Sequence, residues 1–350
     1  MLFWVEGDLG RVAELGARSE SRSGLSNLVD SAIAGDHVLF GAREYLTALI
    51  KSGFINDKEI SFLAAASQRL TQEGRTIVSL PKVRVSVDYE ETQLKGKEWL
   101  VPLSVFSDSN VLRMPFLLAE NIRDARLYLA FSRKWMAETL PSYLVKLFPV
   151  HGGGGTTGEV FSGYIADGYP ATICIVDSDR KCSTDPIGQT ARGCLNATEG
   201  NERWQFCLNI LGAREFENII PAALRKNILS GMSAFHHETH DLLLNVPDEV
   251  ALHVCLKEGD SFCRFYASGV LHKENSDDSE VACVLCGRSS ACEVTSGFGS
   301  RYLFRVLESI SDDVAIPSIE YWHDSLRDTA IKVAFFGIGS GPQRLISSKS

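Results

Sequence analysis

Two short apolar runs, each followed directly by acidic residues, constrain this chain more than any other feature. Phe116–Ala119 precedes Glu120, and Ile173–Val176 precedes Asp177 and, two residues on, Asp179. A wholly apolar run of this length is typical of a strand buried on both faces, as in a parallel sheet. In open parallel sheets the functional crevice lies beyond the carboxyl ends of the strands. The sequence therefore predicts an α/β fold that gathers these acids at one edge.

Carboxylates gathered in this way favour a metal site. They repel one another and are costly to desolvate unless a cation compensates them, and Mg²⁺ is typically held by a few carboxylates together with water and phosphate oxygens. Mn²⁺ accepts the same oxygen ligands. The alternative is that Glu120, Asp177 and Asp179 are helix caps and solvated loop residues, which are common at strand ends.

Length, composition and charge limit the number of domains and the classes of function to consider. The chain has 350 residues, of which 45% are hydrophobic, which is enough for one large or two ordinary domains. The net charge of −9 argues against a protein that coats nucleic acid by bulk electrostatics, but not against an enzyme that meets phosphate through metal ions. We expect a cytoplasmic protein without membrane contact, because no apolar run is long enough to span a bilayer and no signal peptide is evident. Nine dispersed cysteines fit reduced thiols.

Residues 1–110 read as a separate unit, either α/β or mostly helical. Its polar stretch 19–26 is expected to be a loop, 37–51 and 57–73 have helical spacing, and 83–88 alternates as a strand does. The segment from Trp4 to Asp8 also resembles a strand that ends in acids. It lacks a following Gly-rich strand at a suitable distance, and is therefore not assigned a catalytic role.

Residues 111–240 alternate between strand and helix patterns. A helix is predicted for 122–140, a strand for 144–150 and a helix for 159–166, with a Gly-rich turn at 151–157 between the last two. Strands that alternate with helices at this spacing imply a parallel sheet with right-handed crossovers.

The second half of this region is predicted to continue with a polar loop over 182–200, an amphipathic helix over 201–211 and a further helix from 216 that Pro221 interrupts. The remaining residues, 241–350, form a C-terminal extension that we expect to pack on the 111–240 core.

Two further clusters, one of histidines and one of cysteines, could be zinc sites. His236 and His240 are four residues apart, and Cys283 and Cys286 are near Cys292. Neither has a complete set of ligands at standard spacing, so buried thiols and ordinary histidines are the favoured alternative.

Taken in order, the motifs of residues 111–240 resemble the toprim domain, and most of all that of the OLD-family nucleases and related bacterial defence nucleases. They are Glu120-x-x-x-Asp124, the Gly-rich turn 152–155, Asp177-x-Asp179 and Arg214-x-x-Glu217-Asn218. One departure is Asn121, which stands where the first motif usually has glycine.

This resemblance implies a parallel-sheet toprim core and a two-metal site. Glu120, Asp177 and Asp179 would hold the first Mg²⁺ or Mn²⁺, while Asp124 and Glu217 would complete the second, with Glu215 as the alternative to Glu217. Two such ions, about 4 Å apart, activate water and stabilise the leaving oxygen in phosphodiester hydrolysis.

Several other residues are candidates by position. Lys181 or Arg180 could be the basic catalytic residue that some toprim proteins carry, although only their closeness to the Asp177 motif favours them. Gly153 and Gly154 could present N–H groups to a phosphate, or could simply form a tight turn. His151, just before them, could contact substrate, although a single histidine at a strand end is more often structural.

The function implied by the resemblance is a metal-dependent nuclease that acts on DNA or RNA in anti-phage or anti-plasmid defence. The sequence contains no Gly-x-x-x-x-Gly-Lys-Ser/Thr motif, so an ATPase would have to be a separate protein partner. Residues 1–110 are the candidate for partner docking or target recognition. The alternatives are a non-catalytic toprim-like subunit that binds a partner or nucleotide, and a phosphoryl-transfer enzyme acting on a small nucleotide.

Overall fold

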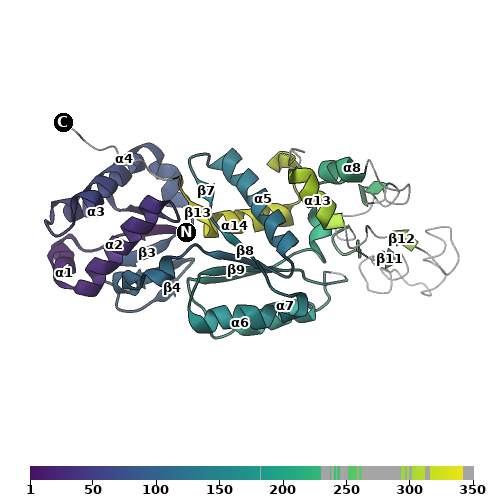
Figure 1. The fold of residues 1–350 in the computed structure, drawn as a ribbon, viewed down its shortest axis with the longest axis horizontal. Coiled ribbons are helices and arrows are strands. Elements are labelled where there is room, and N and C mark those ends of the chain that lie inside the picture. The colour runs from purple at the N-terminus through teal and green to yellow at the C-terminus, as the bar shows by residue number, and fades with distance from the viewer. Residues whose placement is uncertain are drawn as a thin grey trace.

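The protein is an α/β protein with two principal sheets, which confirms the α/β part of the predicted fold class. The computed structural model describes residues 1–181, 183–229, 237, 240–241, 243–244, 251–257, 260–261, 293–295, 298, 302–311 and 316–341. One sheet lies in the N-terminal third of the chain and the other in the middle third (Figure 1). None of the helices in the described ranges combines the length and hydrophobicity needed to span a membrane.

The N-terminal sheet has the strand order β2-β1-β3-β5-β4, and every neighbouring pair is parallel except β4 with β5. Its strands are β1 (Leu2–Val5), β2 (Val38–Gly41), β3 (Val83–Ser86), β4 (Gln93–Lys95) and β5 (Glu98–Pro102). Its helices are α1 (Val12–Ala17), α2 (Ser19–Ala34), α3 (Arg43–Lys51) and α4 (Asp57–Ser79). The unit is therefore α/β rather than mostly helical.

Two sequence predictions in this unit are wrong. The stretch 19–26 begins helix α2 instead of forming a loop, and its Gly24 lies so close to the chain that an added Cβ would stand 2.1 Å from the Leu103 carbonyl oxygen. The first residues of the helix predicted over 37–51 form strand β2, because pairing with β1 satisfies their backbone groups inside the core. By contrast, the helix predicted from residue 57 is confirmed: Asn56 and Glu59 form a capping box at its start.

The second sheet is parallel throughout and has the order β10-β9-β6-β8. Its strands are β6 (Phe116–Ala119), β8 (Phe148–His151), β9 (Thr172–Val176) and β10 (Phe206–Ile210). The predicted strand 144–150 is divided, since Leu144–Val145 forms β7, which pairs instead with the C-terminal strand β13 (Ile338–Gly339). The predicted apolar strands β6 and β9 are confirmed, and β9 is buried along its whole length.

Helices cover both faces of this sheet. Helix α5 (Ile122–Thr139) follows β6, while α6 (Thr157–Asp167) and α7 (Gln189–Thr198) pack together on the opposite side (Figure 1). The alternation of side chains along the strands fits this arrangement. Leu118, Cys174 and Val176 face the α6–α7 layer, whereas Leu117, Ile173 and Ile175 belong to the larger core that includes α5.

The sequence predictions for 182–211 are wrong. Helix α7 occupies 189–198, where a polar loop was expected, and strand β10 occupies 206–210, where a helix was expected. Glycines let α7 approach α6 closely, because a Cβ on Gly158 would lie 2.8 Å from the Gly193 carbonyl carbon. Phe206, Leu208 and Ile210 pack towards α6 and α7 at every second position, as a strand requires.

The two sheets share one strand order. In each, the first strand is central, the second lies on one side of it, and the third and a fourth parallel strand lie on the other. The connections between the last two of these parallel strands differ. Strand β4 lies between β3 and β5 in the first sheet, and helix α7 lies between β9 and β10 in the second. In this ordering Glu6 follows β1 just as Glu120 follows β6.

The C-terminal part of the described chain packs on the second sheet. Helix α14 (Asp324–Phe336) lies along α5, and the rings of Phe131 and Trp322 meet edge to face with centroids 5.2 Å apart. The Met1 amino group donates to the Ile338 carbonyl oxygen at 2.7 Å, which joins the two ends of the described chain. The remaining elements are α8 (Ala222–Leu229), β11 (Asp260–Ser261), β12 (Glu293–Thr295), α13 (Tyr302–Ser311) and β13 (Ile338–Gly339), with 3-10 helices at Leu9–Arg11, Leu103–Ser107, Ser109–Leu112, Gly154–Thr156, Phe216–Ile219 (η5) and Ile319–Tyr321.

Candidate functional site

The predicted acids lie at the point where the second sheet reverses its strand order. From β6 the chain crosses through α5 to β8 on one side, then returns through α6 to β9 on the other. Glu120 and Asp177 directly follow the neighbouring strands β6 and β9. In open parallel sheets this switch point is where ligands bind. The fold therefore places the two acids where a functional site is expected.

Helix α5 brings a second acid to Glu120. Asn121 caps the helix by accepting a hydrogen bond from the Arg123 N–H at 3.0 Å, and Asp124 lies in the first turn. Burial raises the pKa of Asp124 to about 6. Burial, followed by the negative charge of Asp179, raises the pKa of Glu120 to about 7. The Oε1 atom of Glu120 is buried and has no hydrogen-bond partner.

A third loop reaches the same place through the short helix η5 (Phe216–Ile219). The Phe216 N–H donates to Asp177 Oδ1 at 3.1 Å, which ties the start of η5 to the end of β9. Glu217 is only 2% exposed, and burial raises its pKa to about 7. Its Oε2 atom also lacks a hydrogen-bond partner. Burial likewise raises the pKa of Asp177 well above its ordinary value.

Glu215, the alternative to Glu217, has partners within the protein. The Cys255 thiol donates to its Oε1 at 3.6 Å, and Arg214 Nε lies 3.9 Å from the same oxygen. Its pKa is raised by burial. Its Oε2 atom is buried without a hydrogen-bond partner, as is Glu217 Oε2. Since Glu217 is the more deeply buried of the two residues, it remains the better candidate ligand.

Asp179 is the most exposed of the predicted ligands. Its backbone is left-handed, with a φ of 54°, and its N–H donates to the Arg214 carbonyl oxygen at 3.0 Å. Gly188 packs against its side chain, because a Cβ there would lie 2.3 Å from Asp179 Oδ2. A left-handed conformation is rare for residues other than glycine, so the surrounding contacts must hold it in place.

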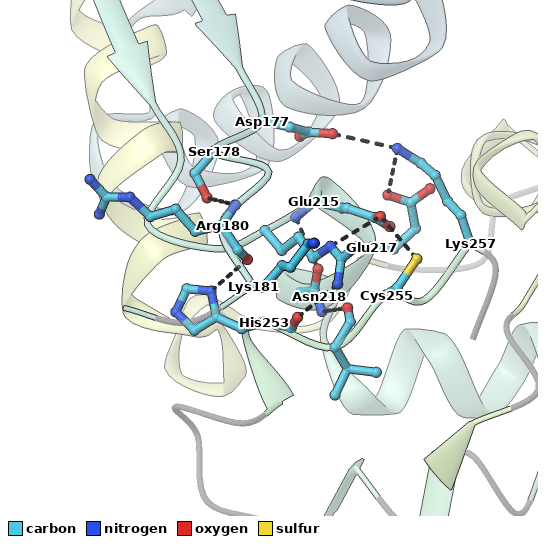
Figure 2. Close-up of polar contacts among 12 residues, drawn as sticks. Asp177, Ser178, Arg180, Lys181, Glu215, Glu217, Asn218, His253, Cys255 and Lys257 are labelled. Atoms are coloured by element: carbon cyan, nitrogen blue, oxygen red, sulfur yellow. Dashed lines mark hydrogen bonds and ion pairs between the residues drawn. The ribbon is translucent and has the colours of Figure 1, made fainter. Parts of the chain in front are cut away.

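A cationic side chain, Lys257, lies beside the carboxylates. Its Nζ lies 3.5 Å from Asp177 Oδ2 and 3.9 Å from Glu217 Oε2 (Figure 2). Burial disfavours its charged form, but the surrounding carboxylates outweigh this and raise the pKa of Lys257. Sequence reasoning missed this residue, because it lies 80 positions after Asp177 and belongs to no motif.

The backbone N–H groups of the remaining candidates, Lys181, Gly153 and Gly154, make hydrogen bonds within the protein. Lys181 is exposed, and its backbone N–H donates to Asp185 Oδ2 at 3.2 Å. The Gly153 N–H donates to His151 Nδ1 at 3.4 Å, and the Gly154 N–H donates to the Glu120 carbonyl oxygen at 3.0 Å. Both glycines have positive φ angles. These N–H groups are therefore used within a tight turn, which is one of the two roles expected for them.

These side chains carry the oxygen ligands that a hard cation prefers, but they are not yet spaced to bind one. Glu120 Oε1 and Glu217 Oε2 are buried oxygens without hydrogen bonds, and buried acceptors of this kind call for a compensating partner. Even so, within the part of the chain that the structure describes, no three His, Cys, Asp or Glu side chains are grouped closely enough to hold a metal ion. The carboxylates would have to converge around an incoming ion.

Of the residues in the two predicted zinc clusters, the structure describes His240, which is buried. His236, Cys283, Cys286 and Cys292 lie outside the residues that the structure describes. Comparison of the chain with family models, with curated proteins and with solved structures finds no match.

Proposed function

We propose that this protein is a metal-dependent nuclease that hydrolyses phosphodiester bonds in DNA or RNA. The observation that carries the proposal is that Glu120, Asp124, Asp177 and Glu217 lie around the switch point of a parallel sheet, close enough that, after burial, the charges of the other three help raise the pKa of Asp177. Two of these acids have buried oxygens without hydrogen bonds. The order of the motifs, which resembles that of toprim nucleases, supports the same reading. It also carries the proposed role in anti-phage or anti-plasmid defence with a protein partner.

The chain's own residues would prepare the site for Mg²⁺ or Mn²⁺. Glu120, Asp177 and Asp179 would hold one ion, and Asp124 and Glu217 would contribute to a second. Bound ions of this kind lower the pKa of water and stabilise charge on a leaving oxygen. The Phe216 N–H fixes Asp177 Oδ1, which leaves Oδ2 to face the site.

A cleavage assay tests the proposal. Supercoiled plasmid, single-stranded DNA and total tRNA are incubated with Mg²⁺, Mn²⁺ or EDTA. We expect cleavage of at least one substrate with metal, and its loss in Glu120→Gln and in Asp177→Asn. Asp167→Asn, which changes an exposed acid at the end of α6, is the matched control and keeps activity. Metal-dependent cleavage that both site variants retain would reject the assignment.

The second candidate function is a non-catalytic subunit that binds a partner or a nucleotide. The position of Lys257 favours it, because an ammonium between Asp177 and Glu217 can neutralise them without metal. The absence of a preformed metal cluster among the described residues points the same way. This function predicts no cleavage under any condition and loss of partner binding in the same acid variants.

A further inference from the structure

We propose that the Lys257 ammonium is the resident counter-ion of the carboxylate site and that a divalent cation displaces it. Lys257 can act in this way only if the site binds metal, so the proposal rests on the proposed function and describes how that site is regulated. The supporting observation is that the backbone of residues 251–257 is held by hydrogen bonds, whereas the Lys257 side chain is held loosely.

The backbone before Lys257 is fixed by its neighbours. Asn218 Nδ2 donates to the carbonyl oxygens of Ala251 and Val254 at 2.8 and 2.9 Å. The Arg214 N–H donates to the Leu252 carbonyl oxygen at 2.8 Å, and Val254, Cys255 and Leu256 are buried. These bonds come from the same loop that carries Glu217. The segment that carries the ammonium is therefore anchored to the loop that supplies one of the acids.

The His253 ring joins this segment to the other side of the site. Its Nδ1 lies 3.2 Å from the Arg180 carbonyl oxygen, just beyond Asp179 (Figure 2). The segment 251–257 is thus attached both to the loop after β9 and to the loop that contains η5. Its position does not depend on the ion pairs of Lys257.

The side chain of Lys257, in contrast, is 43% exposed, while those of Asp177 and Glu217 are 12% and 3% exposed. Its separations from them, 3.5 and 3.9 Å, are longer than the roughly 2.7–2.9 Å of a tight charged hydrogen bond. Lys134, which has a side-chain exposure of 32%, reaches Glu138 Oε1 at 2.7 Å. Charge rather than close hydrogen bonding therefore holds Lys257 at the site.

A divalent cation would compete for the same oxygens. It carries twice the charge and binds carboxylate oxygens at about 2.1 Å in the case of Mg²⁺. Because two cations beside the same carboxylates repel each other, entry of the metal pushes the ammonium outwards. The exposed stem of Lys257 lets its charged end move into water while the backbone stays in place.

Metal affinity tests this exchange without relying on activity. Mn²⁺ binding is measured by calorimetry for wild type, Lys257→Met and Lys257→Arg, with Lys134→Met as the control. Removal of the competing charge should tighten Mn²⁺ binding to Lys257→Met by at least about tenfold, equivalent to about 1.4 kcal/mol. Lys257→Arg and Lys134→Met should stay near wild type. Equal or weaker binding by Lys257→Met overturns the proposal while leaving a metal-dependent nuclease possible.

A second measurement uses the wild-type protein, in case Lys257→Met does not fold. Amine acetylation is followed by mass spectrometry at Lys257 and at Lys134, with and without Mn²⁺. We expect metal to accelerate labelling of Lys257 several-fold and to leave Lys134 unchanged. Metal binding without any change at Lys257 overturns the exchange alone. If folded wild type and Lys257→Met both fail to bind Mn²⁺, the exchange and the proposed metal site are rejected together.

Discussion

Replacing Glu217 by glutamine should change how stability depends on pH. Burial raises the pKa of Glu217 from an ordinary 4.5 to about 7, so the folded protein holds this proton more tightly than the unfolded chain does. A raised carboxyl pKa gives stability that is present below the unfolded pKa and is lost as pH rises through the folded pKa. Wild type loses this contribution between about pH 4 and pH 8, whereas glutamine does not titrate.

The size of the effect follows from the same shift. A rise from 4.5 to about 7 corresponds to about 3 kcal/mol, at about 1.4 kcal/mol for each pH unit. Because the Glu217 side chain is only 3% exposed, solvent screening reduces this little. In EDTA, Glu217→Gln should therefore gain about 3 kcal/mol of unfolding free energy relative to wild type between pH 4 and pH 8.

The assay is urea unfolding of both proteins across this range. Their difference is measured because other groups act in the opposite direction: burial lowers the pKa of the Met1 amino group to about 4 and that of His37 well below its ordinary value. Those two contributions are lost as pH falls, and they cancel between the two proteins. Glu138→Gln is the control. The hydrogen bond from Lys134 lowers the pKa of Glu138, so this carboxylate stabilises the wild-type fold as pH rises. Glu138→Gln should therefore gain no unfolding free energy relative to wild type with rising pH.

Parallel pH curves for wild type and Glu217→Gln would refute the reasoning, because they would show that Glu217 titrates normally. Added Mg²⁺ supplies a further check. At a concentration 100 times its dissociation constant, a ligand stabilises the folded state by about 2.7 kcal/mol. If Glu217 is a ligand, wild type at pH 8 should recover more stability with Mg²⁺ than the glutamine variant does.

Three further predictions concern the loops and helices around the site. Asp179→Ala should be about 1 kcal/mol less stable than Asp179→Asn, because asparagine tolerates the left-handed backbone that alanine resists, and thermal unfolding of both variants checks this. Gly158→Ala should destabilise the protein by about 1–3 kcal/mol where α6 meets α7, whereas Gly163→Ala on the open side of α6 should stabilise it by about 0.5–1 kcal/mol; chemical unfolding measures both. Asn218→Ala removes three hydrogen bonds, one accepted from the Glu215 N–H and two donated to the Ala251 and Val254 carbonyl oxygens, and should cost about 2–3 kcal/mol, with faster hydrogen exchange in 251–257 as the specific readout.

The two central strands of the second sheet were predictable because the pattern that specifies them lies within a few consecutive residues. A short apolar run between polar segments has few alternatives to a buried strand, and β6 and β9 lie where the sequence placed them. The polar stretch that became α7 had no such pattern. It is helical because its glycine-containing face packs on α6, which is a contact between distant parts of the chain. The strand order common to both sheets was also invisible in the sequence, since it concerns how strands pair.

The sequence by itself determined which acids follow the buried strands, because strand burial and the position of the next residue are both set within a few residues. Only the tertiary structure decided what surrounds those acids. In the N-terminal sheet Glu6 is paired with Arg84 at 2.5 Å, whereas Glu120 at the corresponding place keeps a buried oxygen without a hydrogen bond. The counter-ion beside Asp177 comes from Lys257, at a distance along the chain that no local pattern spans. Burial and charge depend on every segment that packs around a site, so they emerge only when the chain is folded.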